Sequence, residues 1–284
     1  MIYILLPVFN RREITKRFIA CLNTQTYTNY HLVLIDDGST DGTAEMAKNY
    51  VHELTIIHGN GNWWWAGSLQ QGYKWVRSQK LNNDDIILLI NNDTTFQNDF
   101  LKIGLNILNQ HSNTLLLAQE YSLQDNRLID AGVHIDWKQL SFKQAKTPEE
   151  INCLSTRGLF MKAMDFLKLG GFYPKLLPHY LSDYEFTYRA HRKGMCLRTD
   201  PSLQLLGDEK ATGQRQFNQK LLIPHIREVI SKGSVRNPIY LTSFILLSCP
   251  WRWKFRNIFK VWHGIMSGGV TRIFRKLKTD EYNK

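Results

Sequence analysis

The chain has 284 residues, of which 43% are hydrophobic and 21% are charged, and its formal net charge is +11. This composition is typical of a globular protein with one large core, and it excludes a disordered or fibrous chain. The excess of positive charge lies near the end: residues 1–209 carry 21 Lys and Arg against 22 Asp and Glu, whereas residues 210–279 carry 14 against Glu228 alone. We therefore expect an anionic partner for the C-terminal part only, either a phospholipid surface or nucleic acid.

The cysteines and the apolar segments argue against a secreted or membrane-spanning protein. The apolar start, residues 1–6, lacks a basic region and meets Pro7, so it is interpreted as a first strand and not as a signal peptide. The longest later apolar stretch, residues 239–249, is about half the ~20 residues that a spanning helix needs. No spacing typical of a zinc or redox site relates the cysteines, which are Cys21, Cys153, Cys196 and Cys249. We expect a cytoplasmic protein with reduced thiols and no transmembrane segment.

Strands and helices are predicted to alternate along the first half of the chain. Apolar runs predict strands at residues 3–6, 31–35, 54–57 and 86–90, and helical patterns predict helices at about 12–24, 40–50, 68–78 and 99–110. Further strands are expected near 115–118 and 132–137, and a helix at 186–193. Such alternation favours an α/β fold, with a mostly parallel sheet flanked by helices.

Polar clusters follow two of the predicted strands directly. Asp36-Asp37-Gly38-Ser39 follows the strand at 31–35, and Asn91-Asn92-Asp93 follows the strand at 86–90. Because parallel strands bring their carboxyl ends to one edge of a sheet, where ligands bind, we expect these clusters to share a site. Residues 39–42 also supply helix-capping side chains, so a helix N-terminus that favours phosphate should lie nearby. The spacing therefore suggests a site for a nucleotide diphosphate.

Four motifs in order resemble those of glycosyltransferase family 2. They are Pro7-Val8-Phe9-Asn10, Ile35-Asp36-Asp37-Gly38-Ser39-Thr40-Asp41-Gly42-Thr43, Leu89-Ile90-Asn91-Asn92-Asp93 and Asp183-Tyr184-Glu185, and the match covers about residues 1–215. The resemblance implies the GT-A fold, which has a Rossmann-like sheet, for a catalytic domain at residues 1–215. It also implies an inverting transfer of one sugar from a nucleotide-diphosphate sugar to a hydroxyl of an acceptor.

Similar proteins of the rhamnosyl and galactosyl types act in the biosynthesis of bacterial surface polysaccharides such as O-antigen. The resemblance therefore implies a UDP- or dTDP-linked donor and a glycan acceptor, which we expect to be lipid-linked if the C-terminal region binds a membrane. Two other functions stay open. A sugar nucleotidyltransferase is disfavoured because residues 7–12 lack the usual glycine-rich loop, whereas a catalytically degenerate nucleotide-sugar-binding protein fits the replacement of acidic family residues by Asn91 and Ser182.

The resemblance also assigns a donor site to particular residues. Asp36 is expected to accept a hydrogen bond from a pyrimidine imide, and Arg157 to contact the diphosphate. A turn or helix cap is the alternative for Asp36 and Asp37, and a structural salt bridge is the alternative for Arg157. The expected donor-binding residues are Pro7, Phe9, Asn10, Asp36, Asp37, Asn62, Trp65, Asn91, Asn92 and Arg157.

Asp93 is the expected ligand of a divalent cation, Mg²⁺ or Mn²⁺, that neutralises the departing diphosphate. The family's usual Asp-x-Asp is replaced here by Asn91-Asn92-Asp93, which leaves one carboxylate. Because Mg²⁺ keeps several waters and also binds substrate phosphates, one carboxylate can suffice. An ordinary turn after the strand is the alternative. Candidates for a more distant metal ligand are Asp208, Glu209 and His225.

Asp183 matches the family's catalytic base, which removes the proton from the acceptor hydroxyl. The Glu that commonly precedes this base is replaced by Ser182. Glu185 is expected either to orient the acceptor or to support the site from behind, and His179 and Tyr180 are expected at the acceptor rim. The alternative for Asp183 is a carboxylate that only complements the dipole at the start of a helix.

Residues 216–284 are expected to form a basic helical region that associates with a membrane. Trp, Phe and Ile opposite Lys and Arg are typical of helices that lie at the surface of anionic lipids. Packing onto the catalytic domain or a second subunit is the alternative, and nucleic acid is disfavoured because a wide apolar stripe has no role on a phosphate backbone. We expect the protein at the cytoplasmic face of the cell membrane. The apolar positions recur every three or four residues at Phe255, Ile258, Phe259, Trp262, Ile265 and Met266, and again at residues 270–277.

Overall fold

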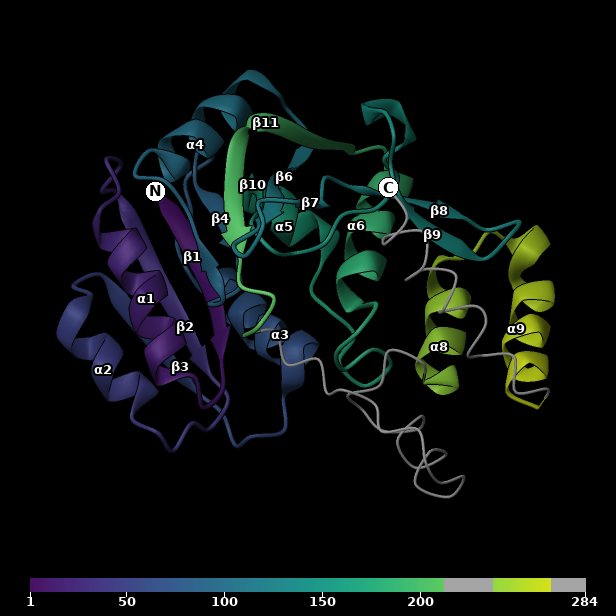
Figure 1. The fold of residues 1–284 in the computed structure, drawn as a ribbon, viewed down its shortest axis with the longest axis horizontal. Helices are drawn as coiled ribbons and strands as arrows, with labels where there is room; N and C mark the ends of the chain where they lie inside the picture. The colour runs from purple at the N-terminus through teal and green to yellow at the C-terminus, as the bar shows by residue number, and fades with distance from the viewer. Residues whose placement is uncertain (212–236, 267–284) are drawn as a thin grey trace.

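The computed structural model describes residues 1–211 and 237–266. Its centre is a mixed sheet with helices on both faces (Figure 1), which confirms the predicted α/β class. The strands of this sheet are β1 (Ile2–Val8), β2 (Tyr30–Asp36), β3 (Leu54–His58), β4 (Ile86–Leu89), β5 (Thr94–Thr95), β6 (Thr114–Ser122), β7 (Leu128–Asp130), β10 (Leu159–Lys162) and β11 (Cys196–Gly207). Their order is β3-β2-β1-β4-β10-β6-β11-β5, and β7 pairs with β6.

The first four strands along the chain are mutually parallel, as predicted, and β6 and β11 also pair in parallel. β1 pairs in parallel with β2 on one side and with β4 on the other, and β3 continues the parallel order beyond β2. The register joins Val8 to Asp36, so the carboxyl ends of β1 and β2 lie together. β10 interrupts this order, because it is antiparallel to both β4 and β6. A separate hairpin consists of β8 (Val133–Asp136) and β9 (Ser141–Gln144).

The helices lie close to the predicted positions, but three begin elsewhere. α2 begins at Thr43 instead of residue 40, α3 at Trp64 instead of residue 68, and α6 at Ser182 instead of residue 186. The second shift follows from hydrogen bonds that Asp37 accepts at the start of α3. The helices are α1 (Arg12–Asn23), α2 (Thr43–Tyr50), α3 (Trp64–Arg77), α4 (Phe100–Gln110), α5 (Ala163–Leu169), α6 (Ser182–Arg192), α8 (Pro238–Ser248) and α9 (Trp251–Met266), with a 3₁₀ turn η1 (Pro148–Glu150).

Alternate side chains of the strands enter two different cores. Ile4 and Leu6 of β1 pack with Phe18 of α1 on one face of the sheet, whereas Leu5 packs with Leu69 of α3 on the other. This division follows from the two-residue period of a strand, which sends successive side chains to opposite faces. The strands are therefore buried on both sides, and the polar clusters that follow β2 and β4 are held at one edge of a rigid sheet.

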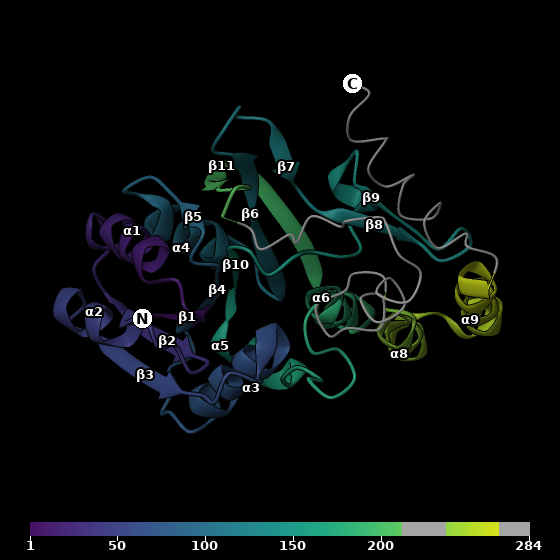
Figure 2. The same cartoon turned by 60° about the horizontal axis from the view of Figure 1, so that its bottom comes forward.

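A third core joins the C-terminal helices to the rest of the molecule. Trp137, which follows β8, stacks on Phe244 of α8 and contacts Tyr188 of α6 edge to face. Val261 of α9 is 3% exposed in the same core. Figures 1 and 2 show α8 and α9 beside α6, at the end of the molecule that is remote from α1 and α2. In the parts of the chain that the structure describes, no helix combines the length and the apolar character that crossing a bilayer requires.

Candidate active site

Asp36 and Asp37, at the end of β2, hold the loops of the donor edge. The backbone N–H of Gly61 donates to Asp37 Oδ1 at 2.9 Å, and those of Trp63 and Trp64 donate to Oδ2 at 2.8 and 3.1 Å. Asp36 Oδ1 accepts a bond from the backbone N–H of Ser39 at 2.8 Å. Both carboxylates are buried. The observed contacts therefore match the turn and cap alternative, and Asp37 fixes the loop that leads into α3.

The remaining donor-edge residues surround this loop. The side-chain oxygen of Asn10 accepts a bond from the backbone N–H of Thr40 at 2.8 Å, which ties the end of β1 to the turn after β2. Phe9 is 50% exposed beside Gly61, and Asn62 is exposed. Pro7 is buried within β1. Phe9, Asn10 and Asn62 are thus the members of this group that a ligand can reach.

The Asn91-Asn92-Asp93 turn lies against the N-terminus of α1. Arg11 Nη1 is 3.2 Å from Asp93 Oδ2 and 3.5 Å from Asn92 Oδ1. Asn92 Nδ2 donates to Thr15 Oγ1 at 2.9 Å, and the carbonyl of Asn91 accepts a bond from the hydroxyl of Thr94. Asn92 therefore anchors the turn, and the charge of Arg11 faces the carboxylate of Asp93.

Asp93 offers one oxygen to a metal ion. Its side chain is 2% exposed, and Oδ1 is buried with no hydrogen-bond partner in residues 1–211 and 237–266. In the same residues no group of three or more His, Cys, Asp or Glu side chains could hold a metal. The donor set therefore fits a cation that takes one protein carboxylate and completes its shell from phosphate and water. Asp208 approaches through its backbone N–H, which donates to the Asp93 carbonyl at 2.9 Å, and His225 lies outside the described residues.

Arg157 is paired with Glu120, a residue that the sequence analysis did not identify. Arg157 Nη1 donates to Glu120 Oε1 at 2.6 Å. Burial raises the pKa of Glu120 to about 6, and the charge of Arg157 opposes this rise. Burial alone would lower the pKa of Arg157, but the charges of Glu120, Asp93 and Asp130 outweigh it and raise that pKa. The expected salt bridge of Arg157 is present, and the side chain also lies within electrostatic reach of Asp93.

Asp183 lies in the first turn of α6 on the same side of the molecule. Burial raises its pKa to about 6, because the surrounding protein disfavours the charged form, and the charge of Arg157 partly opposes this rise. The side chain nevertheless keeps contact with solvent. A carboxyl that is surrounded by protein and still reached by water is suited to exchange a proton with a bound hydroxyl. The charge of Arg157 acts on both Asp93 and Asp183, so the three side chains lie in the same region of the molecule.

Glu185 is directed into the interior. Its side chain is buried and forms two hydrogen bonds with Arg189, at 2.9 and 3.0 Å. Arg189 also donates to the carbonyl of Gly171 at 2.8 Å. Because α6 is already helical at Ser182, Glu185 does not share the face of Asp183. Two roles were expected for Glu185. Its pairing with Arg189 in the interior does not fit direct orientation of the acceptor, but it fits support of α6 from behind the site.

Aromatic side chains close the site between α3 and α6. The backbone N–H of Ala66 donates to the carbonyl of Pro178 at 3.0 Å, which joins the tryptophan segment to the loop before α6. His179 packs edge to face on Trp64 and on Tyr180. Burial lowers the pKa of His179 to about 4, and the charge of Arg11 adds to this effect, so the ring is neutral at pH 7. His179 and Tyr180, which were expected at the acceptor rim, therefore also lie close to the tryptophan segment that was expected beside the donor.

The backbone on both sides of this contact is left-handed. Trp64 has φ of 57° and Leu181 has φ of 67°, values that bulky L-residues rarely adopt and that cost roughly 1–2 kcal/mol each. Trp65 is held by a bond from its indole N–H to the hydroxyl of Thr156 at 3.1 Å. The strained residues and the anchored indole fix the direction of both loops at the point where they meet.

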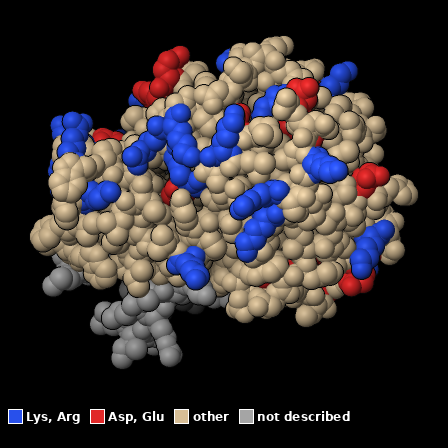
Figure 3. Space-filling model, turned by 180° about the vertical axis from the view of Figure 1, so that it is seen from behind, with Lys and Arg blue, Asp and Glu red and all other residues tan. Residues whose placement is uncertain are grey.

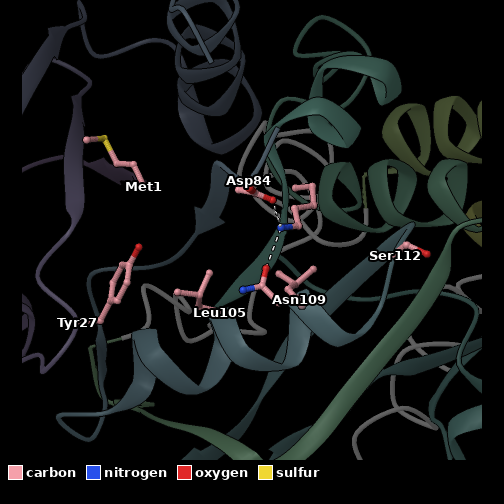
Figure 4. A pocket seen from close by; sticks show the side chains of 8 residues that line it. Met1, Tyr27, Asp84, Leu105, Asn109 and Ser112 are labelled. Atoms are coloured by element: carbon pink, nitrogen blue, oxygen red, sulfur yellow. Dashed lines mark hydrogen bonds and ion pairs between the residues drawn. The ribbon is translucent and has the colours of Figure 1, made fainter. Parts of the chain in front are cut away.

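A surface hollow at the opposite edge of the sheet is not part of this site. Figure 4 shows Met1, Tyr27, Leu105 and Ser112 around it. Met1 precedes β1, whereas the predicted site follows the carboxyl end of that strand. Lys162 bridges the hollow by contacts with Asp84 and Asn109, at 3.6 and 2.9 Å. We assign this hollow no catalytic part.

Three site residues escaped the sequence analysis. Arg11 lies directly after a motif residue, and its basic character beside an acidic turn was a usable signal. Glu120 and Asp130 follow no motif, and they join the site because β6 and β7 pair at that position. Only the pairing of strands far from the motifs brings their charges near Arg157.

Comparison with known proteins identifies the family. The model of glycosyl transferase family 2 matches residues 3–166, more than half of the chain. The chain belongs to this family. It is 31% identical over 114 residues to an uncharacterized glycosyltransferase of Haemophilus influenzae, covering 39% of the chain and 43% of that relative. Another uncharacterized glycosyltransferase of that organism is 23% identical over 189 residues, covering 66% and 60%. Glycosyltransferase GlyA of Streptococcus pneumoniae serotype 4 is 22% identical over 130 residues, covering 44% and 17%.

Solved glycosyltransferases share the fold of this family 2 member. The mannosyltransferase PcManGT from Pyrobaculum calidifontis, in complex with GDP-Man and Mn²⁺, has a TM-score of 0.59 at 13% identity and covers 100% of this chain and 75% of its own. GalNAc-T7 with UDP, GalNAc and Mn²⁺ has a TM-score of 0.61 at 13% identity, covering 94% and 58%. The predicted GT-A fold and glycosyltransferase class are confirmed. The chain spans between 17% and 60% of the length of the curated relatives named above.

Proposed function

We propose that this glycosyltransferase moves one sugar, with inversion at the anomeric carbon, from a nucleotide-diphosphate sugar to a hydroxyl of a lipid-linked glycan in bacterial surface polysaccharide biosynthesis, of the rhamnosyl or galactosyl type. The supporting observation is the placement of Arg157 within electrostatic reach of both Asp93 and Asp183. A group that binds the leaving diphosphate and a group that takes the acceptor proton must flank the anomeric carbon. The electrostatic interaction of both carboxylates with Arg157 supports their assignment to these two parts.

Each side chain has a distinct part in the proposed reaction. Asp183, ionised above its raised pKa, accepts the proton of the acceptor hydroxyl as that oxygen attacks. Arg157, held by Glu120, donates hydrogen bonds to the diphosphate. Asp93 Oδ1 would hold Mg²⁺ or Mn²⁺, which supplies charge neutralisation at the leaving group. Both neighbouring structures contain Mn²⁺, which supports a divalent cation here.

The donor is proposed to be a UDP or dTDP sugar. Asp36 lies at the carboxyl end of β2, where a buried carboxylate can accept the imide hydrogen of a pyrimidine. The residues that we propose to line the donor site are Pro7, Phe9, Asn10, Asp36, Asp37, Asn62, Trp65, Asn91, Asn92 and Arg157. A panel of UDP, dTDP and GDP sugars with Mn²⁺ tests this by thermal unfolding, because a bound ligand raises the apparent stability. A larger rise with GDP sugars than with any pyrimidine nucleotide would contradict the donor assignment.

Turnover of the donor tests the reaction. With a stabilising donor and a lipid-linked acceptor, we expect release of the nucleoside diphosphate and a product of inverted anomeric configuration, detected by NMR. Release of pyrophosphate would instead indicate a nucleotidyltransferase. Binding without release under any acceptor condition would indicate the degenerate binding protein that Asn91 and Ser182 left open.

A membrane surface is the proposed partner of the C-terminal helices, within residues 216–284. α9 packs one face inward, where Asn257 is buried and donates from Nδ2 to the Trp137 carbonyl at 2.8 Å. Its outer face leaves Trp251, Phe255 and Phe259 exposed at 75%, 67% and 71%. Trp262 donates to Thr242 of α8 at 3.1 Å, which joins this stripe to α8. We call the exposed residues of both helices the aromatic patch: Ile239, Leu246, Trp251, Phe255, Phe259 and Trp262.

Basic side chains border the aromatic patch. At 100° per residue, Arg252, Arg256 and Lys260 follow one side of the stripe along α9, and Lys254 lies on the other. Figure 3 shows a face with more Lys and Arg than Asp and Glu, including at the end that holds α8 and α9. An aromatic stripe bordered by basic residues fits the interface of an anionic bilayer, where the rings enter the headgroup layer. The inner face of α9 packs onto the rest of the protein, as the packing alternative expects. The outer face is proposed to bind a partner. The proposed location is the cytoplasmic face of the cell membrane.

Point variants test this surface better than truncation, because α8 and α9 contribute to the third core. Replacing Trp251, Phe255 and Phe259 by Ser should lower recovery with anionic vesicles at least tenfold, since burial of each ring contributes about 1.5–3 kcal/mol. A control replaces the exposed Tyr50 and Met164 of the catalytic part by Ser. Equal flotation of all three proteins, or equal binding to neutral vesicles, would contradict an anionic membrane partner.

A further inference from the structure

The proposed metal ligand Asp93 is paired with a basic side chain of the protein, that of Arg11. Arg11 Nη1 lies 3.2 Å from Asp93 Oδ2 and is also 3.5 Å from Asn92 Oδ1. The Asp93 side chain is 2% exposed, whereas that of Arg11 is 28% exposed. The guanidinium thus faces the buried carboxylate from the solvent side and compensates its charge.

The start of α1 fixes this contact. Arg11 precedes the first helical residue, and its carbonyl accepts the backbone N–H of Thr15 at 2.8 Å. Thr15 lies one turn further along the same face and accepts the Asn92 amide at 2.9 Å. Residues one turn apart at the start of α1 therefore contact the Asn92-Asp93 segment. Thr15 anchors it through a neutral hydrogen bond, and Arg11 contacts it through a charged side chain.

The two oxygens of Asp93 are in different states. Oδ2 forms an ion pair with Arg11, whereas Oδ1 is buried without a partner in the described parts of the chain. A buried carboxylate needs compensation of its charge, and removal of that compensation is costly. Arg11 and a divalent cation both compensate the same single carboxylate, and two positive groups beside one carboxylate repel each other.

We propose that Arg11 is a built-in counter-ion that competes with a divalent cation for the charge of Asp93, so that cation and nucleotide bind together. The inference rests on the proposed donor site. A diphosphate supplies negative oxygens both for the cation and for the guanidinium, so it relieves this competition. Without nucleotide, Arg11 keeps the affinity of Asp93 for the cation low. The two ligands are thereby coupled through one side chain, and each raises the affinity of the site for the other.

Binding of Mn²⁺ alone, followed by electron paramagnetic resonance of the free ion, tests this without any turnover. Arg11→Ala and Arg11→Gln should bind Mn²⁺ about tenfold more tightly than the wild type, since a charged hydrogen bond no longer competes. Arg11→Gln keeps a neutral donor beside the carboxylate in case the alanine variant fails to fold. Arg12→Ala is the matched control, because Arg12 is exposed and contacts Glu13 instead; its Mn²⁺ affinity should equal that of the wild type.

A second pair of variants separates this inference from the metal assignment. Asp93→Asn should abolish Mn²⁺ binding in the wild-type and in the Arg11→Gln backgrounds. If Asp93→Asn abolishes binding but both Arg11 variants bind no more tightly than the wild type, the counter-ion role is wrong and the metal site stands. If Asp93→Asn binds Mn²⁺ as the wild type does, or if no variant binds it, both the metal assignment and the counter-ion role are wrong.

Discussion

The carboxylates on the two sides of the site differ in what they contact. At the end of β2, the two oxygens of Asp37 accept hydrogen bonds from three backbone N–H groups. Asp36 accepts one from the backbone of the turn that follows it. Around Arg157, Asp93 keeps one oxygen without a partner in the described residues, and Asp183 has a raised pKa. The first pair stabilises the fold, whereas the second pair is kept in a state that costs free energy. Acidic side chains near the same edge of the sheet thus differ in task according to the groups that surround them.

The largest effect is expected at Asp183. Asp183→Asn should lower kcat by about a thousandfold, because a positioned base contributes 10²–10⁴. The free energy of unfolding should not fall, since the amide needs no charge in a buried position. Kinetics with saturating donor and urea unfolding measure the two effects. Retention of more than a tenth of the wild-type kcat would remove Asp183 as the base.

Asp37 should show the reverse behaviour. Asp37→Asn replaces an acceptor-only group by one that turns an N–H toward backbone donors, so the free energy of unfolding should fall by about 2–4 kcal/mol. The exposed Asp84→Asn serves as the control, with a change within about 0.5 kcal/mol. Urea titration measures both. If Asp37→Asn lost activity at unchanged stability, Asp37 would act on the substrate directly and the contrast drawn above would fail.

A variant of Glu120 tests whether Arg157 needs its ion-pair partner in order to bind the donor. Glu120→Gln keeps the shape of the side chain but weakens the bond to Arg157, so the KM for the donor should rise about tenfold at a nearly constant kcat. Glu149→Gln, a change at an exposed site on η1, should leave KM unchanged. An unaltered donor KM in Glu120→Gln would mean that Arg157 is oriented without Glu120.

The smallest expected effect is on the pH dependence of stability. Burial raises the pKa of Asp183 from 3.8 to about 6, so the folded state binds this proton more tightly than the unfolded state does. The favourable contribution is complete below about pH 4 and is lost as the pH rises to about 6, and it amounts to about 1–2 kcal/mol after allowance for solvent contact. Urea unfolding at pH 4.5 and 7.5 should therefore show the wild type losing stability relative to Asp183→Asn. A constant difference between the two proteins would contradict the raised pKa.

The parallel half of the sheet was predictable because short-range patterns determine it. Residues 32–35 and 86–90 are apolar at every position and too short for a typical helix, which is the pattern of a strand buried on both faces. Helix starts were less predictable. α3 begins at Trp64 because Asp37, 27 residues earlier, accepts its backbone N–H, and no local pattern contains that bond. The early start of α6 has a similar consequence, since it turns Glu185 away from Asp183.

The sequence by itself determined the position of the first four strands along the chain, the polar residues that follow them and the family, because each depends on neighbours in the chain. Only the tertiary structure decided which acidic side chains belong to the Arg157 site and which merely hold loops. Glu120 and Asp130 reach Arg157 through strand pairing, and Arg11 reaches Asp93 through packing of α1 against a turn more than 80 residues away. The physical reason is that the charge state and contacts of a buried group depend on surroundings that distant segments supply.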